Sequence, residues 1–256
     1  MLILVWPLPM LVVRLFDRDP VRYRTGLWFR RLGRAITRAN PAWHLTVTGN
    51  TSIDPRRPYV VVSNHQSMAD IPLISNLPWE MKWLAKEELF RLPYLGWMLR
   101  LAGDIRVDRK DARSGGQALQ RARHYLDQKC SVMIFPEGTR SLDGRVRRFS
   151  EGAFHLAVTS ETAILPIAVD GTFDCIPKNT WQLGPPSEIR LHLLDPVETL
   201  GCSREDISAV RDRVRSAIVS QIASWRNVPP ASVDGLAESS HSATVATDSP
   251  GDLTQD

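Results

Sequence analysis

Residues 59–70 read Tyr-Val-Val-Val-Ser-Asn-His-Gln-Ser-Met-Ala-Asp, an apolar run that passes directly into polar side chains. A continuous apolar run is typical of a strand that is covered on both faces, as in a parallel sheet. The sequence therefore predicts a buried strand over 59–63, followed by a turn that carries His65 and Asp70. Histidine titrates near neutral pH, and a neighbouring carboxylate fixes its tautomer and stabilises its charged form. The pattern favours His65 as a general base that Asp70 orients.

The spacing of these two residues constrains the turn. Side chains three or four residues apart share a face of a helix, whereas side chains five residues apart do not. His65 and Asp70 can therefore meet only if the chain bends where the strand passes into a helix. The alternative is a structural role, in which His65 caps a buried helix end and Asp70 makes a hydrogen bond at the helix terminus.

A second apolar run, 131–134, leads into residues 135–140, which read Phe-Pro-Glu-Gly-Thr-Arg. Gly138 permits a backbone turn close to a ligand, and the Arg140 guanidinium can bind a phosphate through two parallel hydrogen bonds. Glu137 is expected to accept a hydrogen bond from a substrate hydroxyl or to orient Arg140. A base and an anion clamp together indicate chemistry on a hydroxyl of a phosphate-bearing substrate. The alternative is a tight turn with a solvated Glu–Arg pair.

Apolar runs alternate with helical patterns along most of the chain. This alternation favours an α/β fold with a layered, mostly parallel sheet flanked by helices. With 256 residues, of which 43% are hydrophobic, the chain can bury one full core. We expect strands at 44–48, 59–63, 81–85, 105–107, 131–135, 163–169 and 188–194, and helices at 20–39, 70–77, 86–101, 111–129, 151–159 and 204–225. The Leu92-Pro93 pair is a candidate kink in the helix over 86–101.

The N-terminal residues have a different character. Residues 1–13 are apolar but fewer than the roughly 20 that a membrane-spanning helix needs. Residues 1–40 carry a net charge of +6, against +4 for the whole chain, which is typical of an interfacial anchor on an anionic membrane surface. We therefore expect a membrane-associating helical segment over 1–40, the main domain over 41–227, and a disordered, Ser-, Thr- and Pro-rich tail over 228–256. The alternative for 1–40 is a helix pair that packs on the domain with solvated arginines.

Three cysteines, Cys130, Cys175 and Cys202, show neither paired spacing nor a metal-ligand grouping. We therefore expect no metal site, and the lack of a disulfide framework fits a reducing compartment such as the cytoplasm. The arginines accompany an apolar segment and no nucleic-acid-binding motif, so nucleic acid is not an expected partner.

Four segments, in their order along the chain, resemble the glycerolipid acyltransferases, which include the 1-acylglycerol-3-phosphate acyltransferases. The resemblance spans about residues 20–225, and it implies the glycerol-3-phosphate acyltransferase-like α/β fold. It also implies an acyltransferase that moves a fatty acyl group from an acyl thioester to the sn-2 hydroxyl of lysophosphatidic acid, which forms phosphatidic acid in phospholipid biosynthesis. The four segments are Asn64-His65 with Asp70, Gly103-Asp104-Ile105-Arg106-Val107-Asp108-Arg109, residues 135–140, and Ile164-Leu165-Pro166-Ile167-Ala168.

The resemblance assigns roles residue by residue. It implies that His65 is the base, that Asp70 orients it, and that the acceptor site is formed by Arg109, Glu137, Gly138, Thr139 and Arg140, with Arg109 and Arg140 on the phosphate. The donor would be acyl-CoA or acyl carrier protein, used as a co-substrate without any further cofactor. The enzyme would act at the cytoplasmic face of a membrane, the inner membrane if the source is bacterial.

Two features of the sequence refine this expectation. No Gly-x-Ser-x-Gly nucleophile elbow is present, so we expect direct attack by the acceptor hydroxyl, with the oxyanion stabilised by backbone donors near the turn. Glu151 stands where many relatives have a lysine, which puts a second cationic contact at that position in doubt. Arg145, Arg147 and Arg148 are the basic residues that could compensate, and the alternative, which the sequence favours, is a solvated loop.

Three alternatives stay open at this point. The same chemistry would serve another acceptor, such as a lyso-ornithine lipid or another lysophospholipid. A thioesterase or lipase would use His65 to activate water, and the expected phosphate-binding arginines argue against it. A non-catalytic membrane-binding protein would need only the basic N-terminal segment.

Overall fold

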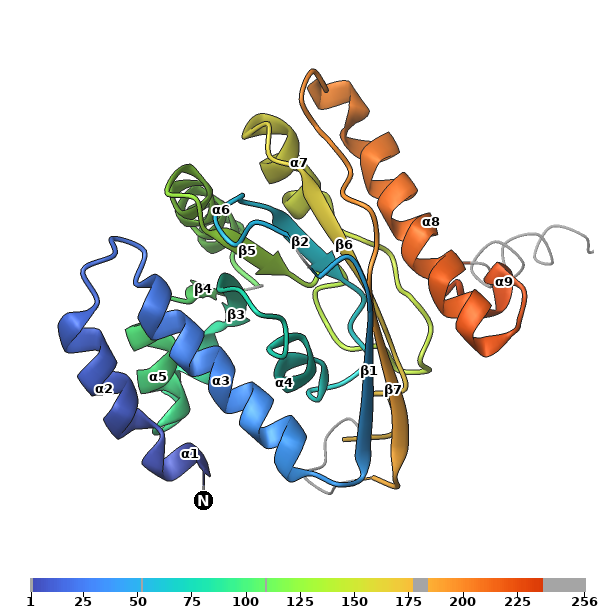
Figure 1. Cartoon of the computed structure of the whole chain (residues 1–256). Helices are drawn as coiled ribbons and strands as arrows, with labels where there is room; N and C mark the ends of the chain where they lie inside the picture. Colours follow the sequence, from blue (N-terminus) through green and yellow to red (C-terminus); the bar gives the residue numbers. More distant parts are fainter. Residues whose placement is uncertain (1, 52, 109, 177–183, 237–256) are drawn as a thin grey trace, which may run out of the picture.

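The computed structural model describes residues 2–51, 53–108, 110–176 and 184–236. Within them, seven strands form one sheet in the order β1-β7-β6-β2-β5-β3-β4 (Figure 1). The strands are β1 (Trp43–Gly49), β2 (Val60–Ser63), β3 (Met81–Lys86), β4 (Ile105–Val107), β5 (Ser131–Ile134), β6 (Ile164–Asp170) and β7 (Ser187–Leu193).

The strand β2 lies between β5 and β6 and runs parallel to both. In the described part of the chain, the pairing of β6 with β7 is antiparallel and the other strand pairs are parallel. The expected α/β fold with a mostly parallel sheet flanked by helices is therefore confirmed.

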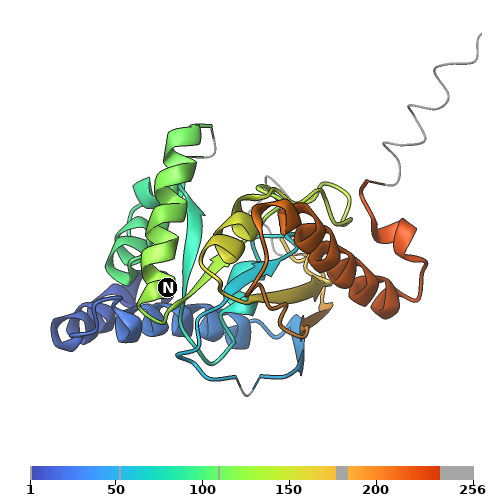
Figure 2. The same cartoon turned by 90° about the horizontal axis from the view of Figure 1, so that it is seen from above.

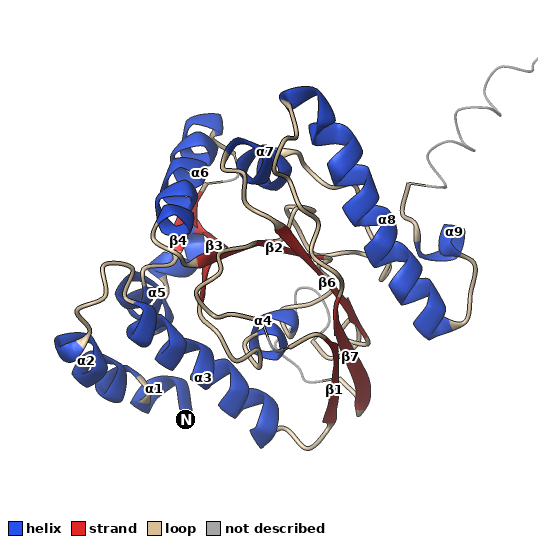
Figure 3. Cartoon of the chain, turned by 45° about the horizontal axis from the view of Figure 1, so that its top comes forward, coloured by secondary structure: helices blue, strands red, loops and turns tan. Residues whose placement is uncertain are grey.

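Helices cover both faces of the sheet (Figure 3). One face is covered by α6 (Ala112–Asp127), α7 (Gly152–Thr159) and α8 (Ile207–Arg226). The other carries α3 (Tyr23–Ala39) and the short α4 (Asp70–Ile74), and α3 in turn contacts α1, α2 and α5. The bounds of the elements that remain are α1 (Leu2–Val5), α2 (Pro7–Phe16), α5 (Leu95–Ala102), α9 (Pro230–Val233) and the two 3-10 helices η1 (Glu87–Arg91) and η2 (Arg204–Asp206).

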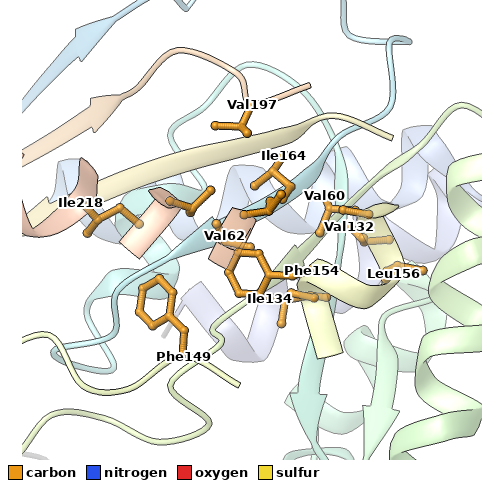
Figure 4. Packing of buried hydrophobic residues seen from close by; sticks show 14 of the residues in the cluster. Val60, Val62, Val132, Ile134, Phe149, Phe154, Leu156, Ile164, Val197 and Ile218 are labelled. Atoms are coloured by element: carbon orange, nitrogen blue, oxygen red, sulfur yellow. The ribbon is translucent and has the colours of Figure 1, made fainter. Parts of the chain in front are cut away.

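The alternation of side chains along β2 explains why its apolar run is continuous. Val60 and Val62 face the cluster under α6, α7 and α8, whereas Val61 faces the cluster on the opposite side of the sheet. All three valines are fully buried. Figure 4 shows Val60 and Val62 packed with Val132 and Ile134 of the neighbouring β5. Burial on both faces fixes the position of β2. Residues 64–70, which follow its carboxyl end, therefore begin at a fixed position at the edge of the sheet.

The helix expected over 86–101 is divided into two helices at the Leu92-Pro93 pair, where the sequence indicated a kink. The chain forms η1, leaves helical geometry at Leu92, whose ψ is 136°, and starts α5 at Leu95. Pro93 lacks the N–H that an unbroken helix would need. At Gly96 a Cβ would lie 2.2 Å from the carbonyl oxygen of Phe90, so glycine allows the two pieces to approach closely.

A buried ion cluster joins the N-terminal helix α3 to the sheet. Its members are Arg30 on α3, Glu80 and Lys82 at the start of β3, and Asp104 before β4, and all four side chains are at most 5% exposed. Arg30 contacts Asp104 at 2.5 Å and Glu80 at 3.3 Å, and Lys82 contacts Glu80 at 2.9 Å. At Gly26 a Cβ would lie 2.0 Å from Glu80 Oε1, so this glycine lets α3 lie against the cluster. Residues 23–39 are therefore part of the folded core.

The helices α1 and α2 leave large apolar side chains in solvent. Leu8, Leu15 and Phe16 are 69%, 73% and 75% exposed, respectively. The indole of Trp6 donates to the carbonyl oxygen of Trp28 at 3.0 Å, which fixes the start of α2 on α3. Among the described residues, no helix combines the length and the apolar character that crossing a bilayer requires.

The predicted tail boundary at residue 228 is corrected by the structure. Residues 230–233 form α9, and Val233 is fully buried in the cluster under α8. Val146 and Asp234 form a β-bridge, so this segment pairs with the chain that follows β5. The sequence pattern did not reveal these contacts because one apolar residue, Val233, supplies the burial. The rest of the predicted tail, 237–256, lies outside the described residues.

Candidate active site

The two polar turns singled out in the sequence follow β2 and β5, which are neighbours in the sheet. Val62 and Ile134 are partners in the parallel register, so both strands end at the same edge. Ligand sites in open parallel sheets lie outside the carboxyl ends of the strands. The fold therefore brings residues 64–70 and 135–140 together, as their separate positions after buried strands predict.

His65 and Asp70 are in direct contact. The His65 Nδ1 and Asp70 Oδ2 atoms are 2.7 Å apart, with the side chains 7% and 0% exposed. Asp70 is the first residue of α4, and its Oδ2 also accepts the backbone N–H groups of Gln66 and Ser67 at 2.8 and 2.9 Å. An ionised Asp70 holds the proton on Nδ1, so Nε2 is the ring nitrogen left to accept a proton.

The imidazole ring is held from its face as well as from its edge. His65 stacks on Phe135 with ring centroids 4.0 Å apart and an interplanar angle of 15°. Asn64 exchanges two hydrogen bonds with the backbone of Val169 at 2.8 and 2.9 Å, which fixes the start of the turn to β6. These contacts leave the ring little freedom to rotate.

The carboxylate of Glu137 links the backbones of the two turns. Its Oε1 accepts the backbone N–H of His65 at 2.7 Å, and its Oε2 accepts the backbone N–H of Arg147 at 3.1 Å. Burial raises the pKa of Glu137 to about 7, although the two backbone N–H donors oppose that shift. Both carboxylate oxygens of Glu137 thus accept backbone donors, and its contact with a substrate hydroxyl or with Arg140 stays a prediction.

Residues 138–141 of this second turn lie beside the backbone of His65. Gly138 has φ +71°, a backbone conformation that glycine adopts readily, and its N–H donates to the carbonyl oxygen of Phe135 at 3.1 Å. Thr139 and Arg140 are partly exposed, and the next N–H, that of Ser141, donates to the carbonyl oxygen of His65 at 2.8 Å. Arg140 therefore leaves the backbone beside the histidine. The other predicted phosphate ligand, Arg109, lies outside the described residues.

The expected oxyanion donors at the first turn are already engaged. The N–H groups of residues 65, 66 and 67 donate to Glu137 or Asp70. The hydroxyl of Ser67 donates to the carbonyl oxygen of Ile176 at 3.0 Å, and that of fully buried Ser63 donates to the carbonyl oxygen of Asn64 at 3.0 Å. Neither serine is arranged as a nucleophile, and an oxyanion needs donors other than these three backbone groups.

Three supporting residues were missed in the sequence. Gln66 donates to Asp170 Oδ1 at 3.2 Å and accepts the hydroxyl of Thr172 at 3.2 Å. Arg226, the last residue of α8, contacts the same Asp170 oxygen at 2.6 Å and donates to the carbonyl oxygen of Gly144 at 3.1 Å. Asp170 ends an apolar strand as His65 follows one, which is the signal that could have drawn attention to it.

Comparison with known proteins assigns the family. Residues 44–170 match the family model described as "Acyltransferase", and this range includes both turns. A 1-acyl-sn-glycerol-3-phosphate acyltransferase alpha of Mus musculus is 36% identical over 175 residues, 68% of this chain. The chain belongs to the acyltransferase family. This acyltransferase spans 61% of the length of that relative.

Other similar proteins share the same description. A chloroplastic 1-acyl-sn-glycerol-3-phosphate acyltransferase of Arabidopsis thaliana is 32% identical over 180 residues, which are 70% of this acyltransferase and 50% of that relative. The crystal structure of the 1-acyl-sn-glycerophosphate acyltransferase PlsC from Thermotoga maritima superposes with a TM-score of 0.67 at 29% identity. It covers 84% of this chain and 87% of that one, which supports the similarity over nearly the whole described fold.

Proposed function

We propose that this acyltransferase transfers a fatty acyl group from an acyl thioester to the sn-2 hydroxyl of lysophosphatidic acid, forming phosphatidic acid. The observation that carries the proposal is the 2.7 Å contact between His65 Nδ1 and Asp70 at the end of β2, beside the turn that bears Arg140. The proteins of Mus musculus and Arabidopsis thaliana that the chain resembles are described by the same reaction.

In the proposed reaction, Nε2 of His65 acts as the base. His65 Nε2 takes the proton of the acceptor hydroxyl as its oxygen attacks the thioester carbonyl carbon, and Asp70 stabilises the imidazolium that forms. The tetrahedral intermediate collapses as the C–S bond breaks, and the imidazolium returns the proton to the leaving thiolate. The ester and the free thiol are the products, and His65 ends the cycle neutral.

Arg140 is the acceptor's phosphate ligand in this proposal, together with Arg109. A guanidinium binds two phosphate oxygens at once, which orients the glycerol as well as attracting it. Thr139 contributes a hydroxyl and Gly138 contributes backbone groups to the proposed acceptor site. Glu137 positions this site by accepting the backbone N–H groups of His65 and Arg147. Ser67 forms no acyl-enzyme intermediate in this proposal, because its hydroxyl donates a hydrogen bond to the carbonyl oxygen of Ile176.

Membrane association belongs to the same proposal. The exposed apolar side chains of α1 and α2, among them Leu8, Leu15 and Phe16, would enter the acyl region of a bilayer. Exposed arginines on α3, such as Arg24 and Arg31, would meet anionic headgroups, each with about 1 kcal/mol near the surface. We propose that the protein lies on the cytoplasmic face of its membrane, where acyl-CoA or acyl carrier protein can supply the donor.

An acceptor panel tests this function. Purified protein in detergent micelles is given a labelled acyl thioester with lysophosphatidic acid, lyso-ornithine lipid, lysophosphatidylcholine or no acceptor. The proposal predicts labelled phosphatidic acid and little free fatty acid. Preferred acylation of another lyso-lipid would change the acceptor, and fatty acid release without acceptor would indicate a thioesterase. Vesicle sedimentation with a Leu8, Leu15 and Phe16 to Ser triple variant tests the membrane contact separately.

A further inference from the structure

Residue 151 does not offer a cation to the active site. The carboxylate of Glu151 contacts Arg211 Nη1 at 2.8 Å and accepts the hydroxyl of Ser208 at 3.0 Å, both on α8. Glu151 is thus part of a surface contact between the start of α7 and α8. A second positive group near the acceptor, if the site has one, comes from another residue.

The backbone of Arg147 is linked to the backbone of His65 through the side chain of Glu137. Its N–H donates to one oxygen of the Glu137 carboxylate, and the N–H of His65 donates to the other. The carboxylate of Glu137 therefore bridges the backbone nitrogens of His65 and Arg147. The Arg147 side chain is exposed, and its positive charge also acts on Glu137, where it opposes the effect of burial on the pKa.

The backbone around Arg147 is fixed on both sides. Its carbonyl oxygen accepts Arg215 Nε at 2.9 Å, and the preceding carbonyl of Val146 accepts Arg215 Nη2 at 2.6 Å. Arg215 is buried on α8 and is held in turn by both carboxylate oxygens of Asp234 at 2.6 and 3.0 Å. A residue anchored in this way loses less conformational freedom when its side chain binds a ligand.

We propose that Arg147 is a second cationic contact for the phosphate of the acceptor, acting with Arg140. Arg140 precedes Ser141, whose N–H donates to the carbonyl oxygen of His65, and the N–H of Arg147 donates to the carboxylate that also accepts the His65 N–H. A phosphate dianion placed between the two arginines would fix the acceptor hydroxyl relative to Nε2. This inference rests on the proposed acyl transfer to lysophosphatidic acid.

The neighbouring Arg148 provides a matched control. It is also exposed and carries the same charge, but its charge acts on Asp212 of α8. The variants R147Q and R148Q therefore remove the same charge from adjacent positions. R147K keeps the charge and removes the two-point guanidinium contact. Thermal unfolding of each variant establishes that it is folded.

Steady-state kinetics with lysophosphatidic acid and with monoacylglycerol, which lacks the phosphate, tests the inference. R147Q is expected to raise the KM for lysophosphatidic acid about tenfold or more, which is the effect of losing a charged hydrogen bond. R147K should fall between R147Q and wild type, and R148Q should match wild type. With monoacylglycerol, R147Q and wild type should have equal kcat/KM.

Two results would overturn the inference in distinguishable ways. Equal KM values for lysophosphatidic acid in R147Q and R148Q, with active wild type, would remove Arg147 from the acceptor site and leave the proposed function intact. No phosphatidic acid from folded wild-type protein would overturn the proposed function, and the inference with it.

Discussion

The carboxylate of Glu137 accepts the backbone N–H of His65 at 2.7 Å, so the acidic residue of one motif holds the histidine of the other. The carbonyl oxygen of His65 accepts the N–H of Ser141 at 2.8 Å. Both polar backbone atoms of His65 are thus bonded to the chain that follows β5. The turn that carries His65 and the turn over residues 137–141 are therefore held together by hydrogen bonds, so we expect a change in either turn to affect the other.

Glu137→Gln should lower kcat by about tenfold or more. An amide keeps one accepting oxygen, and its NH2 group would face a backbone N–H, leaving a buried donor unpaired at a cost of about 1–3 kcal/mol. The shifted peptide would carry the His65 ring away from its productive position. The exposed Glu161→Gln serves as the control, and both are measured by initial rates at saturating substrate. A folded Glu137→Gln with wild-type kcat would show that the backbone contact is not needed.

The same residue predicts a pH dependence of stability. Burial raises the pKa of Glu137 from 4.5 to about 7 in the folded protein, so the folded state binds this proton more tightly than the unfolded state. The contribution of Glu137 to the free energy of unfolding is therefore fully present below about pH 4.5 and is lost as the pH rises through 7. Urea unfolding of wild type and Glu137→Gln at several pH values should show wild type losing stability relative to the variant over this window. Parallel curves for the two proteins would contradict the shift.

Arg30→Ala should be strongly destabilising. It removes the cation that contacts Asp104 at 2.5 Å and Glu80 at 3.3 Å, and both carboxylates are fully buried. Removing one partner from a buried ion pair costs about 3–5 kcal/mol, because the remaining charge is left uncompensated. Arg31→Ala, the exposed neighbour on α3, should change the free energy of unfolding by less than about 1 kcal/mol. Similar urea midpoints for the two variants would disprove a stabilising role for the buried ion cluster.

Two truncations test the end of the folded domain. A chain ended after Leu236 should keep the stability and activity of the full protein. A chain ended after Pro229 loses buried Val233, worth about 1.5–3 kcal/mol, and the carboxylate that holds Arg215. We expect a lower melting temperature and a reduced rate for the shorter chain. Equal melting temperatures for both truncations would place the end of the stable domain before α9.

Much of the fold and the centre of the candidate site could be predicted because they depend on local patterns. The apolar run that ends at Ser63 specifies a buried strand, and its partner run ending at Ile134 specifies another. When two such strands are parallel neighbours, their following turns meet, so the proximity of His65 to residues 135–140 follows from topology alone. The contact of His65 with Asp70 follows from the bend between strand and helix.

The remaining contacts could not be predicted because they join residues far apart in the chain through individual polar atoms. Both oxygens of Glu137 accept hydrogen bonds from backbone N–H groups, and no periodic pattern in the sequence indicates such contacts. Arg30 resembles the solvated arginines around it and is distinguished only by the carboxylates it meets across α3 and the sheet. Asp234 lies in a polar segment, and its role becomes visible only with Arg215 beside it.

The proposed membrane contact lies far from the contacts made by α8. The helices α1 and α2, which carry the exposed apolar side chains, lie at the opposite end of the molecule from α8 (Figure 2, dark blue and orange). Changes at Leu8 or Phe16 should therefore alter membrane binding without altering the contacts of Arg215. Detergent micelles, in which membrane binding is not limiting, are accordingly the medium for measuring the chemistry.

The most direct test of the account compares wild type with His65→Ala in acyl transfer from a labelled thioester to lysophosphatidic acid in detergent micelles. A positioned general base contributes about 10²–10⁴-fold, so we predict a drop of at least about 10² in phosphatidic acid formation by a folded variant. Equal rates in the two proteins would contradict the assignment of His65 as the base.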